Sequence, residues 1–382
     1  MHFENAYRGK TVLLTGHTGF KGSWMCEWLS MLGARVVGFS LPDAPTKPSH
    51  FQELGLSGRL GDQDDRRADI RSLESVKEVV ADVRPDFVFH LAAQPLVRLA
   101  FDEPHRTVET NLVGSLNVLE AIRHAERGAI VIMITTDKVY ENAEWLYAYR
   151  EEDALGGHDP YSASKACAEL VISSYRRSFF DRTLQDPDRA PIALASVRGG
   201  NVVGGGDWAL DRIVPDSVRS LSTGEAIPVR NKYSTRPWQH VLELVGGYLY
   251  LGALIDEATS QTGERNVERL RALCSAFNIG PQLASNRTVE ELVRAILGHW
   301  DGEWVDLTDP DARHESSKLN LTIDKAFHVL GWEPRWDFAE TIRQTIDWYH
   351  EFYGAQKRTA ELVTELTRRQ IHEYDEGLQL RL

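Results

Sequence analysis

Apolar residues in the first 200 positions gather in short continuous runs, and segments with helical periodicity separate these runs. A strand covered on both faces reads as an unbroken apolar run, whereas a half-exposed strand alternates apolar and polar residues. We therefore expect parallel strands buried between helices, arranged as a doubly wound α/β sheet. The predicted strands are 11–16, 35–40, 87–93, 130–136 and 190–200.

The pattern changes after Asn201, where isolated helical stretches and a basic segment replace the regular alternation. A long apolar helix and the short strand-like stretch 276–280 follow, and both suit the first sheet better than a separate domain. The predicted units are a first domain of residues 1–200 to which 241–280 return, a smaller C-terminal α+β substrate domain of residues 201–240 and 281–353, and a charged helical tail of residues 354–382, which we interpret as a docking or oligomer-contact segment.

Composition narrows the class of protein. The 382 residues include 43 Lys and Arg against 56 Asp and Glu, and this net charge of −13 argues against nucleic acid or an anionic membrane as partner. The three cysteines, Cys26, Cys167 and Cys274, lie far apart and indicate neither a disulfide framework nor a metal site. No apolar run reaches the roughly 20 residues of a membrane span, and the N-terminus lacks the apolar region of a signal peptide. We expect a soluble, cytoplasmic protein without a metal.

The first predicted strand runs directly into the turn TGHTGFKG, after which a helix begins at once. Glycines at GxxGxxG spacing let the backbone approach a pyrophosphate, whose charge the helix N-terminus stabilises, so the turn predicts a dinucleotide site. Asp43 stands late after the second strand for a ribose contact, and these residues alone leave NAD and NADP open. The residues predicted to bind the cofactor here are Gly16, Thr18, Gly19, Phe20, Lys21 and Gly22.

Other segments follow or end strands of the same sheet. In open α/β sheets the ligand lies beyond the carboxyl ends of the strands, so these segments are expected to converge on one crevice. Asp137 and Lys138 could also form an ordinary exposed ion pair. The residues expected at the crevice are Asp69, Ile70, Leu91, Ala92 and Ala93 beside the cofactor, and Thr136, Asp137 and Lys138 beside a shared ligand.

Tyr161 and Lys165 lie one helical turn apart in the stretch DPYSASK, and Pro160 suits the first turn of a helix. Positions i and i+4 share a face, so the two side chains point the same way. A lysine ammonium beside a phenol favours the phenolate and lowers the phenol pKa from about 10 toward neutrality. The pair therefore predicts a general base.

Together these motifs resemble the extended short-chain dehydrogenase/reductase superfamily, in its nucleotide-sugar branch, and are most similar to the CDP-glucose 4,6-dehydratases. The similarity extends to about residue 353. It is carried by GHTGFKGSW (16–24), HLAAQPLVR (90–98), TTDKVYEN (135–142), YREEDALGGHDPYSASKACAEL (149–170), GNVVGGGDWALDRIVPD (200–216), RPWQHV (236–241) and LGWEPRW (330–336).

The resemblance implies a Rossmann domain with bound NAD, a smaller domain for CDP-glucose, and a homodimer or homotetramer. It implies that Tyr161 removes the proton of the sugar 4-OH while hydride leaves C4, that Lys165 keeps the tyrosine anionic, and that Thr136 binds the 4-oxygen. Water is then lost across C5 and C6, and hydride returns to C6 to give CDP-4-keto-6-deoxyglucose.

The resemblance also implies roles for the remaining polar residues. Asp137 would protonate the departing 6-OH, and Lys138 would either accept the C5 proton or stabilise the enolate as a cation. The dTDP-glucose dehydratases carry Asp-Glu at these two positions, whereas the CDP-glucose branch carries Asp-Lys. The predicted substrate-binding residues are Gln94, Asn201, Arg212, Arg230 and Arg236.

Two other functions share part of this pattern. A nucleotide-sugar 4-epimerase or a UDP-sugar dehydratase has the same glycine-rich turn, tyrosine and lysine, but epimerases need no acid–base pair for water loss. A non-catalytic dinucleotide sensor on the same fold commonly lacks the tyrosine or the lysine, and this chain has both. Asp137 and Lys138 therefore favour the dehydratase.

Overall fold

A seven-stranded parallel sheet forms the centre of the molecule, with the strand order β11-β6-β5-β4-β1-β2-β3. The computed structural model describes residues 1–125, 127–184, 186, 190–261, 264–308 and 319–378. The order and the flanking helices confirm the predicted doubly wound Rossmann sheet. Its strands are β1 (Thr11–Thr15), β2 (Arg35–Ser40), β3 (Asp65–Arg67), β4 (Phe87–His90), β5 (Ala129–Ile134), β6 (Ile192–Gly199) and β11 (Ala276–Ile279).

The two edge strands show where the apolar pattern was and was not informative. β11 pairs with β6, so the short stretch after residue 275 does return to the first sheet, as predicted. β3 was not predicted, because its sequence Asp-Arg-Arg has no apolar residue. An edge strand pairs on one side only, and here a single β2 partner is enough to hold it.

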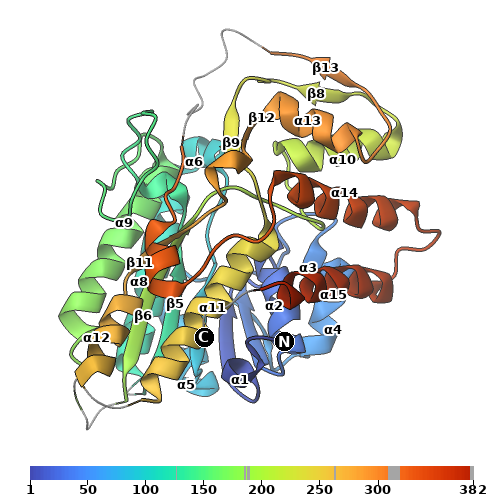
Figure 1. Ribbon diagram of the computed structural model, residues 1–382. Helices are drawn as coiled ribbons and strands as arrows, with labels where there is room; N and C mark the ends of the chain where they lie inside the picture. Colours follow the sequence, from blue (N-terminus) through green and yellow to red (C-terminus); the bar gives the residue numbers. More distant parts are fainter. Residues whose placement is uncertain (126, 185, 187–189, 262–263, 309–318, 379–382) are drawn as a thin grey trace.

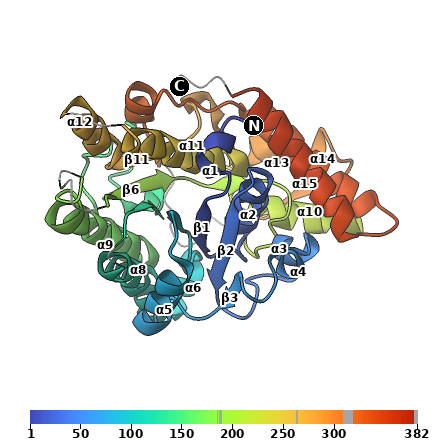
Figure 2. The same cartoon turned by 90° about the horizontal axis from the view of Figure 1, so that it is seen from below.

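Both faces of the sheet are covered, and successive strand residues enter different cores. Leu13 packs with residues of α5 (Leu73–Val83), α8 (Gly114–His124) and α9 (Pro160–Tyr175). Its neighbours Val12 and Leu14 pack with α2 (Phe20–Met31) and α11 (Val241–Thr259). Figure 2 shows α5, α8 and α9 on one side of the sheet and α11 with α1 on the other. Burial on both faces explains why the strands are continuously apolar.

Short elements complete the sheet domain, and a smaller set lies beyond it. Helices α10 and α13 with strands β8 and β13 form the top of the molecule in Figure 1, at the opposite end from α1. The sheet-domain elements are α1 (Glu4–Tyr7), α3 (His50–Glu53), α4 (Leu56–Leu60), α6 (Val97–Asp102), α7 (Pro104–Val108), η1 (Glu109–Val113), η2 (Asp137–Val139), η3 (Arg176–Phe180), α12 (Glu264–Leu273) and η5 (Ala326–Leu330), which contacts β11 and α12. The others are β7 (Val202–Val203), α10 (Ile213–Thr223), β8 (Ile227–Val229), β9 (Thr235–Pro237), β10 (Gln239–His240), η4 (Leu283–Ser285), β12 (Asn286–Thr288), α13 (Val289–Leu297) and β13 (Trp304–Asp306). The exact division into domains stays a prediction.

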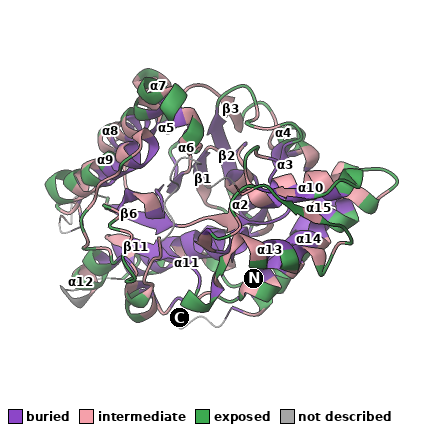
Figure 3. Cartoon of the chain, turned by 90° about the horizontal axis from the view of Figure 1, so that it is seen from above, coloured by how far each residue is buried: buried purple, intermediate pink, exposed green. Residues whose placement is uncertain are grey.

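Figure 3 shows the central strands of the seven-stranded sheet as buried and much of the outward surface of the helices as exposed. Among the helices of the described residues, none combines the length and the apolar character that crossing a bilayer requires.

The predicted C-terminal tail is a helix that docks on the body of its own chain. α15 (Ala360–Glu376) lies beside α14 (Phe338–Gly354), as Figure 1 shows, and also contacts α2. Arg368 Nε lies 2.6 Å from the buried Glu27 carboxylate of α2, and Thr367 Oγ1 lies 3.0 Å from His50 Nε2. These polar contacts, which the sequence pattern did not reveal, join the tail to α2, the helix that follows the glycine-rich turn, and to α3.

Glu243 of α11 makes a further contact between the tail and the rest of the chain. Its buried carboxylate accepts hydrogen bonds from the backbone N–H of Trp336 at 2.6 Å and of Arg335 at 3.0 Å, and from the Tyr374 hydroxyl at 2.8 Å. Burial raises the pKa of Glu243 to about 7, although these hydrogen bonds favour the carboxylate.

We expect Glu243→Gln to become more stable relative to the wild type as the pH rises. The folded chain binds the Glu243 proton more tightly than the unfolded chain, so this contribution to stability is present below the ordinary pKa and is lost as the pH rises through about 7. Between about pH 5 and 8 the difference in unfolding free energy should shift by roughly 2–3 kcal/mol in favour of the variant. Urea unfolding at both pH values measures it.

The comparison must be made against the wild type, because burial lowers the pKa of His50, His90 and His240 to about 3. Those histidines destabilise both proteins equally as the pH falls below their ordinary range. Glu257→Gln on the same helix, at an exposed site, is the matched control. A variant whose stability follows the wild type across this range would contradict the expectation.

Candidate active site

The glycine-rich turn after β1 brings the backbone close to the end of β4. Gly16 has φ +74°, and a Cβ there would lie 2.7 Å from the backbone N of Ala92. A Cβ at Gly22 would lie 2.1 Å from the carbonyl oxygen of Gly16. Gly19 is the N-cap of α2 and has no side chain to cover the helix end. The turn therefore fits a pyrophosphate, which the free N–H groups of the α2 N-terminus would bind.

A carboxylate lies near this turn, but it is not Asp43, whose side chain is exposed. His17 Nε2 lies 2.8 Å from Asp65 Oδ1 of β3, and His17 Nδ1 lies 2.9 Å from Ser40 Oγ. Burial opposes ionisation of Asp65, yet hydrogen bonds from His17, Arg67 and Ser57 outweigh it and hold the Asp65 pKa well below its usual range. The sequence missed this carboxylate because β3 itself was missed.

Of the other predicted cofactor residues, Thr18, Leu91 and Ala92 lie at the turn, whereas Asp69 and Ile70 contact other segments. The backbone N–H of Thr18 lies 3.5 Å from Ser40 Oγ, and Leu91 and Ala92 contact the position of a Gly16 Cβ. Asp69 is bound by Arg71, which donates to it at 2.6 Å. Ile70 packs against Gly114. Ala93 directly follows Ala92, and Phe20 begins α2.

The segment after β5 carries a buried acid and a partly exposed lysine. Thr136 caps η2, and its hydroxyl donates to Asp137 Oδ1 at 3.0 Å. Lys138 Nζ lies 3.1 Å from the same oxygen, with 30% of the lysine side chain and 3% of the aspartate side chain exposed. The alternative of an ordinary exposed ion pair is therefore wrong, because Asp137 is enclosed in the crevice.

Tyr161 and Lys165 lie on α9, as their spacing predicted. Asp159 caps the helix by accepting a hydrogen bond from the backbone N–H of Ser162 at 2.9 Å, and Pro160 occupies its first turn. Both Tyr161 and Lys165 are buried. The Thr136 side chain lies close enough to the Tyr161 phenol to favour its ionisation. The helix and the segment after β5 thus converge on one point at the carboxyl end of the sheet.

The pKa of Tyr161 does not move in the direction that the lysine was predicted to cause. Burial raises it to about 12, and the nearby Thr136 hydroxyl only partly opposes this. Burial also lowers the pKa of Lys165 to about 7, and the neighbouring charge of Lys21 lowers it further. Spacing along a helix reveals neither effect, because both come from desolvation in the folded protein.

Lys21 lies closer to the reacting groups than its place in the glycine-rich turn suggested. Burial lowers its pKa to about 8, and the charges of Arg212 and Lys138 act in the same direction, whereas Asp137 opposes them. Lys138 pairs with the Asp137 carboxylate, Lys21 lies close enough to feel the charges of both, and Arg212 acts on Lys21 and on the Tyr161 phenol. This excess of positive charge suits the stabilisation of oxyanions.

The predicted substrate residues divide into two groups. Asn201 accepts a hydrogen bond from Lys138 Nζ at 3.4 Å, and Arg212 lies near Tyr161 while donating to Asp207 at 3.0 Å. Arg230 donates to Asp211 at 2.7 Å on the exposed surface, and Arg236 donates to its neighbour's carbonyl in β9 at 2.8 Å. The structure thus brings Asn201 and Arg212 to the reacting groups, and it leaves Arg230 on the surrounding surface.

Gln94 uses its amide within its own segment. Its Nε2 donates to the carbonyl of Leu96 at 3.0 Å and to Thr107 Oγ1 at 2.9 Å, and its Oε1 accepts from the backbone N–H of Leu96 at 2.5 Å. These contacts shape the loop that follows β4. A substrate contact by Gln94 stays a prediction.

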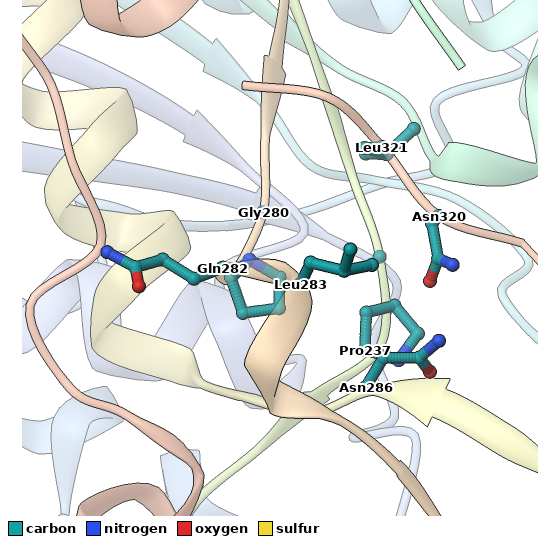
Figure 4. A pocket seen from close by; sticks show the side chains of 9 residues that line it. Pro237, Gly280, Gln282, Leu283, Asn286, Asn320 and Leu321 are labelled. Atoms are coloured by element: carbon teal, nitrogen blue, oxygen red, sulfur yellow. The ribbon is translucent and has the colours of Figure 1, made fainter. Parts of the chain in front are cut away.

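A small pocket borders the crevice beside Gly200. A Cβ at Gly200 would lie 3.1 Å from Asp137 Oδ2, so the pocket and the acid share a wall. Figure 4 shows Asn286 and Asn320 on either side of Pro237. Within the described part of the chain, Asn286 Oδ1 is buried without a hydrogen-bond partner, which marks an acceptor available to a ligand. The lining residues are Gly200, Pro237, Gly280, Pro281, Gln282, Leu283, Asn286, Asn320 and Leu321.

Sequence reasoning missed Asn286. Asn286 stands directly before the capping box that begins α13, in which Thr288 and Glu291 exchange hydrogen bonds. Its segment β12 pairs with β9, opposite Pro237. Only this pairing of distant segments brings the amide to the crevice.

Comparisons with known proteins agree with this geometry. Residues 13–345 match the family described as GDP-mannose 4,6 dehydratase. The CDP-glucose 4,6-dehydratase of Salmonella typhimurium is 41% identical over 348 residues, which cover 91% of this chain and 92% of that protein. The dTDP-glucose 4,6-dehydratase of Streptomyces antibioticus is 28% identical and covers 89% of this chain and 92% of its own length.

Among solved structures, the dTDP-glucose 4,6-dehydratase DesIV of Streptomyces venezuelae, with NAD and TYD bound, has a TM-score of 0.69 and 23% identity over 90% of this chain and 98% of its own. The epimerase Mth375 of Methanothermobacter thermautotrophicus has a TM-score of 0.72 and 23% identity over 97% of each chain. These two likenesses establish the fold. The family match and the Salmonella relative establish that the chain belongs to the GDP-mannose 4,6 dehydratase family, the nucleotide-sugar dehydratases of the extended short-chain dehydrogenase/reductase superfamily.

Proposed function

We propose that the protein is an NAD-dependent CDP-glucose 4,6-dehydratase, a hydro-lyase that converts CDP-glucose to CDP-4-keto-6-deoxyglucose and water. The observation that carries the proposal is the buried Asp137 beside Lys138, in hydrogen-bond contact with Thr136, which in turn contacts Tyr161. Oxidation at C4 needs only the tyrosine and its partners. An added acid and an added cation at the same point are what the loss of water requires.

The glycine-rich turn and the α2 N-terminus fit the cofactor. Gly16 and Gly22 let the turn pack tightly, Gly19 leaves the α2 N-terminus without a side-chain cap, and the segments at the ends of β3 and β4 would line the rest of the site. Bound NAD would accept hydride from C4 of the sugar and return it to C6. The solved structure of DesIV with NAD supports this choice of cofactor.

Tyr161 is the proposed base for the sugar 4-OH, and Thr136 would hydrogen-bond the 4-oxygen. Burial raises the pKa of this phenol, whereas the nearby charge of Arg212 favours the phenolate. Lys165, one helical turn away on α9, is the proposed partner that stabilises the anion.

Asp137 and Lys138 are the proposed pair for the elimination. Once C4 is a ketone, the C5 proton becomes acidic, because the charge left on its removal spreads to the 4-oxygen. Lys138 would accept that proton as a neutral amine or stabilise the enolate as a cation, and protonated Asp137 would donate to the leaving 6-OH. Lys138 Nζ and Asp137 Oδ1 are 3.1 Å apart, so a proton can pass between them.

Substrate choice is testable with the wild-type protein. We expect CDP-glucose to be used at least about 100-fold better in kcat/KM than dTDP-glucose or UDP-glucose, because a site that hydrogen-bonds the cytosine amine leaves buried groups unpaired with the other bases. Product formation is followed by the absorbance of the 4-keto-6-deoxy sugar after alkali treatment. GDP-mannose is the control for the wider family. Equal rates with all three glucose nucleotides would contradict the preference for CDP-glucose. They would not contradict the proposed dehydratase reaction.

The two alternatives predict different products from the same incubation. A 4-epimerase would return a nucleotide hexose without loss of water, and a non-catalytic sensor would return the substrate unchanged. Asp137 in the crevice weighs against the epimerase, and the buried Tyr161 and Lys165 weigh against the sensor.

Association of the protein with itself is also proposed. Val108 of α7, Val113 of η1, and Leu170 and Phe179 of α9 and η3 are exposed apolar residues on adjoining helices. Such a face is typical of a contact with a second copy. Light scattering after size exclusion distinguishes a homodimer or a homotetramer from a monomer.

A further inference from the structure

A buried ion pair that the proposed chemistry does not use lies one helical turn beyond Lys165. Glu169 follows Lys165 by one turn of α9, and Arg198 lies near the end of β6. Arg198 Nη2 donates to Glu169 Oε2 at 2.8 Å, and the exposed side-chain fractions are 5% and 2%. A buried pair of this kind rarely adds stability over well-packed apolar residues, because desolvation of both charges offsets their attraction. Its presence calls for a role other than stability.

The carboxylate of the pair anchors the start of the catalytic segment. Thr135 Oγ1 donates to Glu169 Oε1 at 2.6 Å, and Ser196 Oγ donates to Glu169 Oε2 at 3.1 Å. Thr135 immediately precedes Thr136, and its backbone N–H donates to the carbonyl of Val197 at 2.9 Å. Side chain and backbone of Thr135 are therefore both fixed.

The guanidinium of the pair anchors the other end of the same segment. Arg198 Nη1 donates to the Tyr140 hydroxyl and to the carbonyl of Glu151, each at 2.9 Å. The Tyr140 hydroxyl in turn donates to Asn278 Oδ1 of β11 at 2.7 Å. Tyr140 follows η2, so the residues between Thr135 and Tyr140 are held at both ends by one ion pair.

We propose that Glu169 and Arg198 are positioning residues, which hold the segment 135–140 at both ends and so set Thr136, Asp137 and Lys138 against Tyr161. This inference rests on the proposed function for its catalytic consequence. Glu169 also faces Lys165 from the next turn of α9, and its negative charge favours the protonated lysine. The other charged and titratable groups near Lys165 are Lys21 of α2, which disfavours the protonated lysine, and the buried His90 of β4.

The test uses Glu169→Gln and the double variant Glu169→Gln/Arg198→Met in the full-length protein. Gln keeps the shape and the hydrogen bond to Thr135 but loses the charge, and the double variant removes both charges so that neither is left buried alone. We expect kcat to fall about 10–100-fold in both variants with KM within about threefold of the wild type, because distances near the reacting atoms change while the nucleotide contacts remain. Without the Glu169 charge, Lys165 loses its proton more easily. The fall of kcat on the alkaline side of its pH profile should therefore move to lower pH.

Hydrogen exchange separates this inference from the proposed function. Peptides that cover residues 135–140 should exchange faster in both variants, whether or not CDP-glucose is the substrate. Glu27→Gln is the matched control, because Glu27 is equally buried and pairs with Arg59 and Arg368 away from the catalytic segment. It should lower thermal stability and leave kcat, the pH profile and exchange at 135–140 unchanged.

Two outcomes would overturn the proposal. One is a double variant that folds with wild-type kcat, pH profile and exchange. The other is a loss of activity that Glu27→Gln reproduces at equal thermal stability, which would make the effect one of stability alone. A wild-type protein that does not act on CDP-glucose would instead reject the proposed function, and the exchange measurement would still test the anchoring.

Discussion

Tyr161→Phe should retain the fold and the binding of CDP-glucose, and lose about 1,000-fold or more in kcat. The hydroxyl is the only atom removed, and it is the group that takes the proton from the sugar 4-OH in the proposed reaction. The phenol is buried, so another group cannot readily take its place. Single-turnover kinetics with purified protein measure the rate, and calorimetry with CDP-glucose measures the binding.

The same helix supplies the control. Tyr175 lies at the other end of α9, where its hydroxyl donates to Glu120 at 2.5 Å. Tyr175→Phe also removes one hydroxyl from one helix, and its kcat should stay within about twofold of the wild type because the lost bond is far from the crevice. Near-normal turnover by Tyr161→Phe would defeat the assignment of the base.

The pattern of apolar residues predicted the sheet because burial on both faces leaves a direct trace in the sequence. Strands such as β5, with six buried residues in a row, were located to within about two residues. β3 left no such trace, because its residues are polar and pair only at the edge of the sheet. Because β3 was not predicted, Asp65 was missed as well. The structure places the Asp65 carboxylate beside the glycine-rich turn.

Site residues were predictable where the local spacing alone brings them together. Tyr161 and Lys165 share a helix face whatever the rest of the chain does. Lys21 and Asn286 reach the crevice only through tertiary contacts, and no local pattern reports these. The pKa of Tyr161 also depends on tertiary structure, because burial raises it. The sequence shows only the lysine that would lower this pKa.

The tail gives the same lesson for packing. Its charged composition indicated a helix that docks or makes an oligomer contact, and α15 buries Val363, Leu366, Ile371 and Tyr374 against the rest of the chain. These residues recur at helical spacing along one side, which an amphipathic helix needs in order to dock. Which surface receives that side depends on the fold of the whole chain.

Asp137→Asn and Lys138→Met should each separate the two halves of the reaction. Tyr161, Lys165 and Thr136 remain in both variants, so oxidation at C4 should survive. The loss of water should slow by about 100- to 10,000-fold, because it depends on an acid at the 6-OH and a group that accepts a proton or stabilises charge at C5. After CDP-glucose is added, the absorbance of reduced nicotinamide should therefore build up and persist, whereas the wild type should show little of it.

Exchange at C5 then distinguishes the two roles that Lys138 could have. In deuterated water, Lys138→Met should suppress the entry of solvent deuterium at C5 if the lysine is the base, and it should leave that entry in place if the lysine acts only as a cation. Glu290→Gln is the control for the loss of an ion pair, since Glu290 and Arg294 form a 2.7 Å pair on the surface helix α13. It should turn over normally without a build-up of reduced nicotinamide. If the Asp137 and Lys138 variants behaved like this control, the pair would have no part in the elimination, and the second half of the proposed mechanism would be wrong.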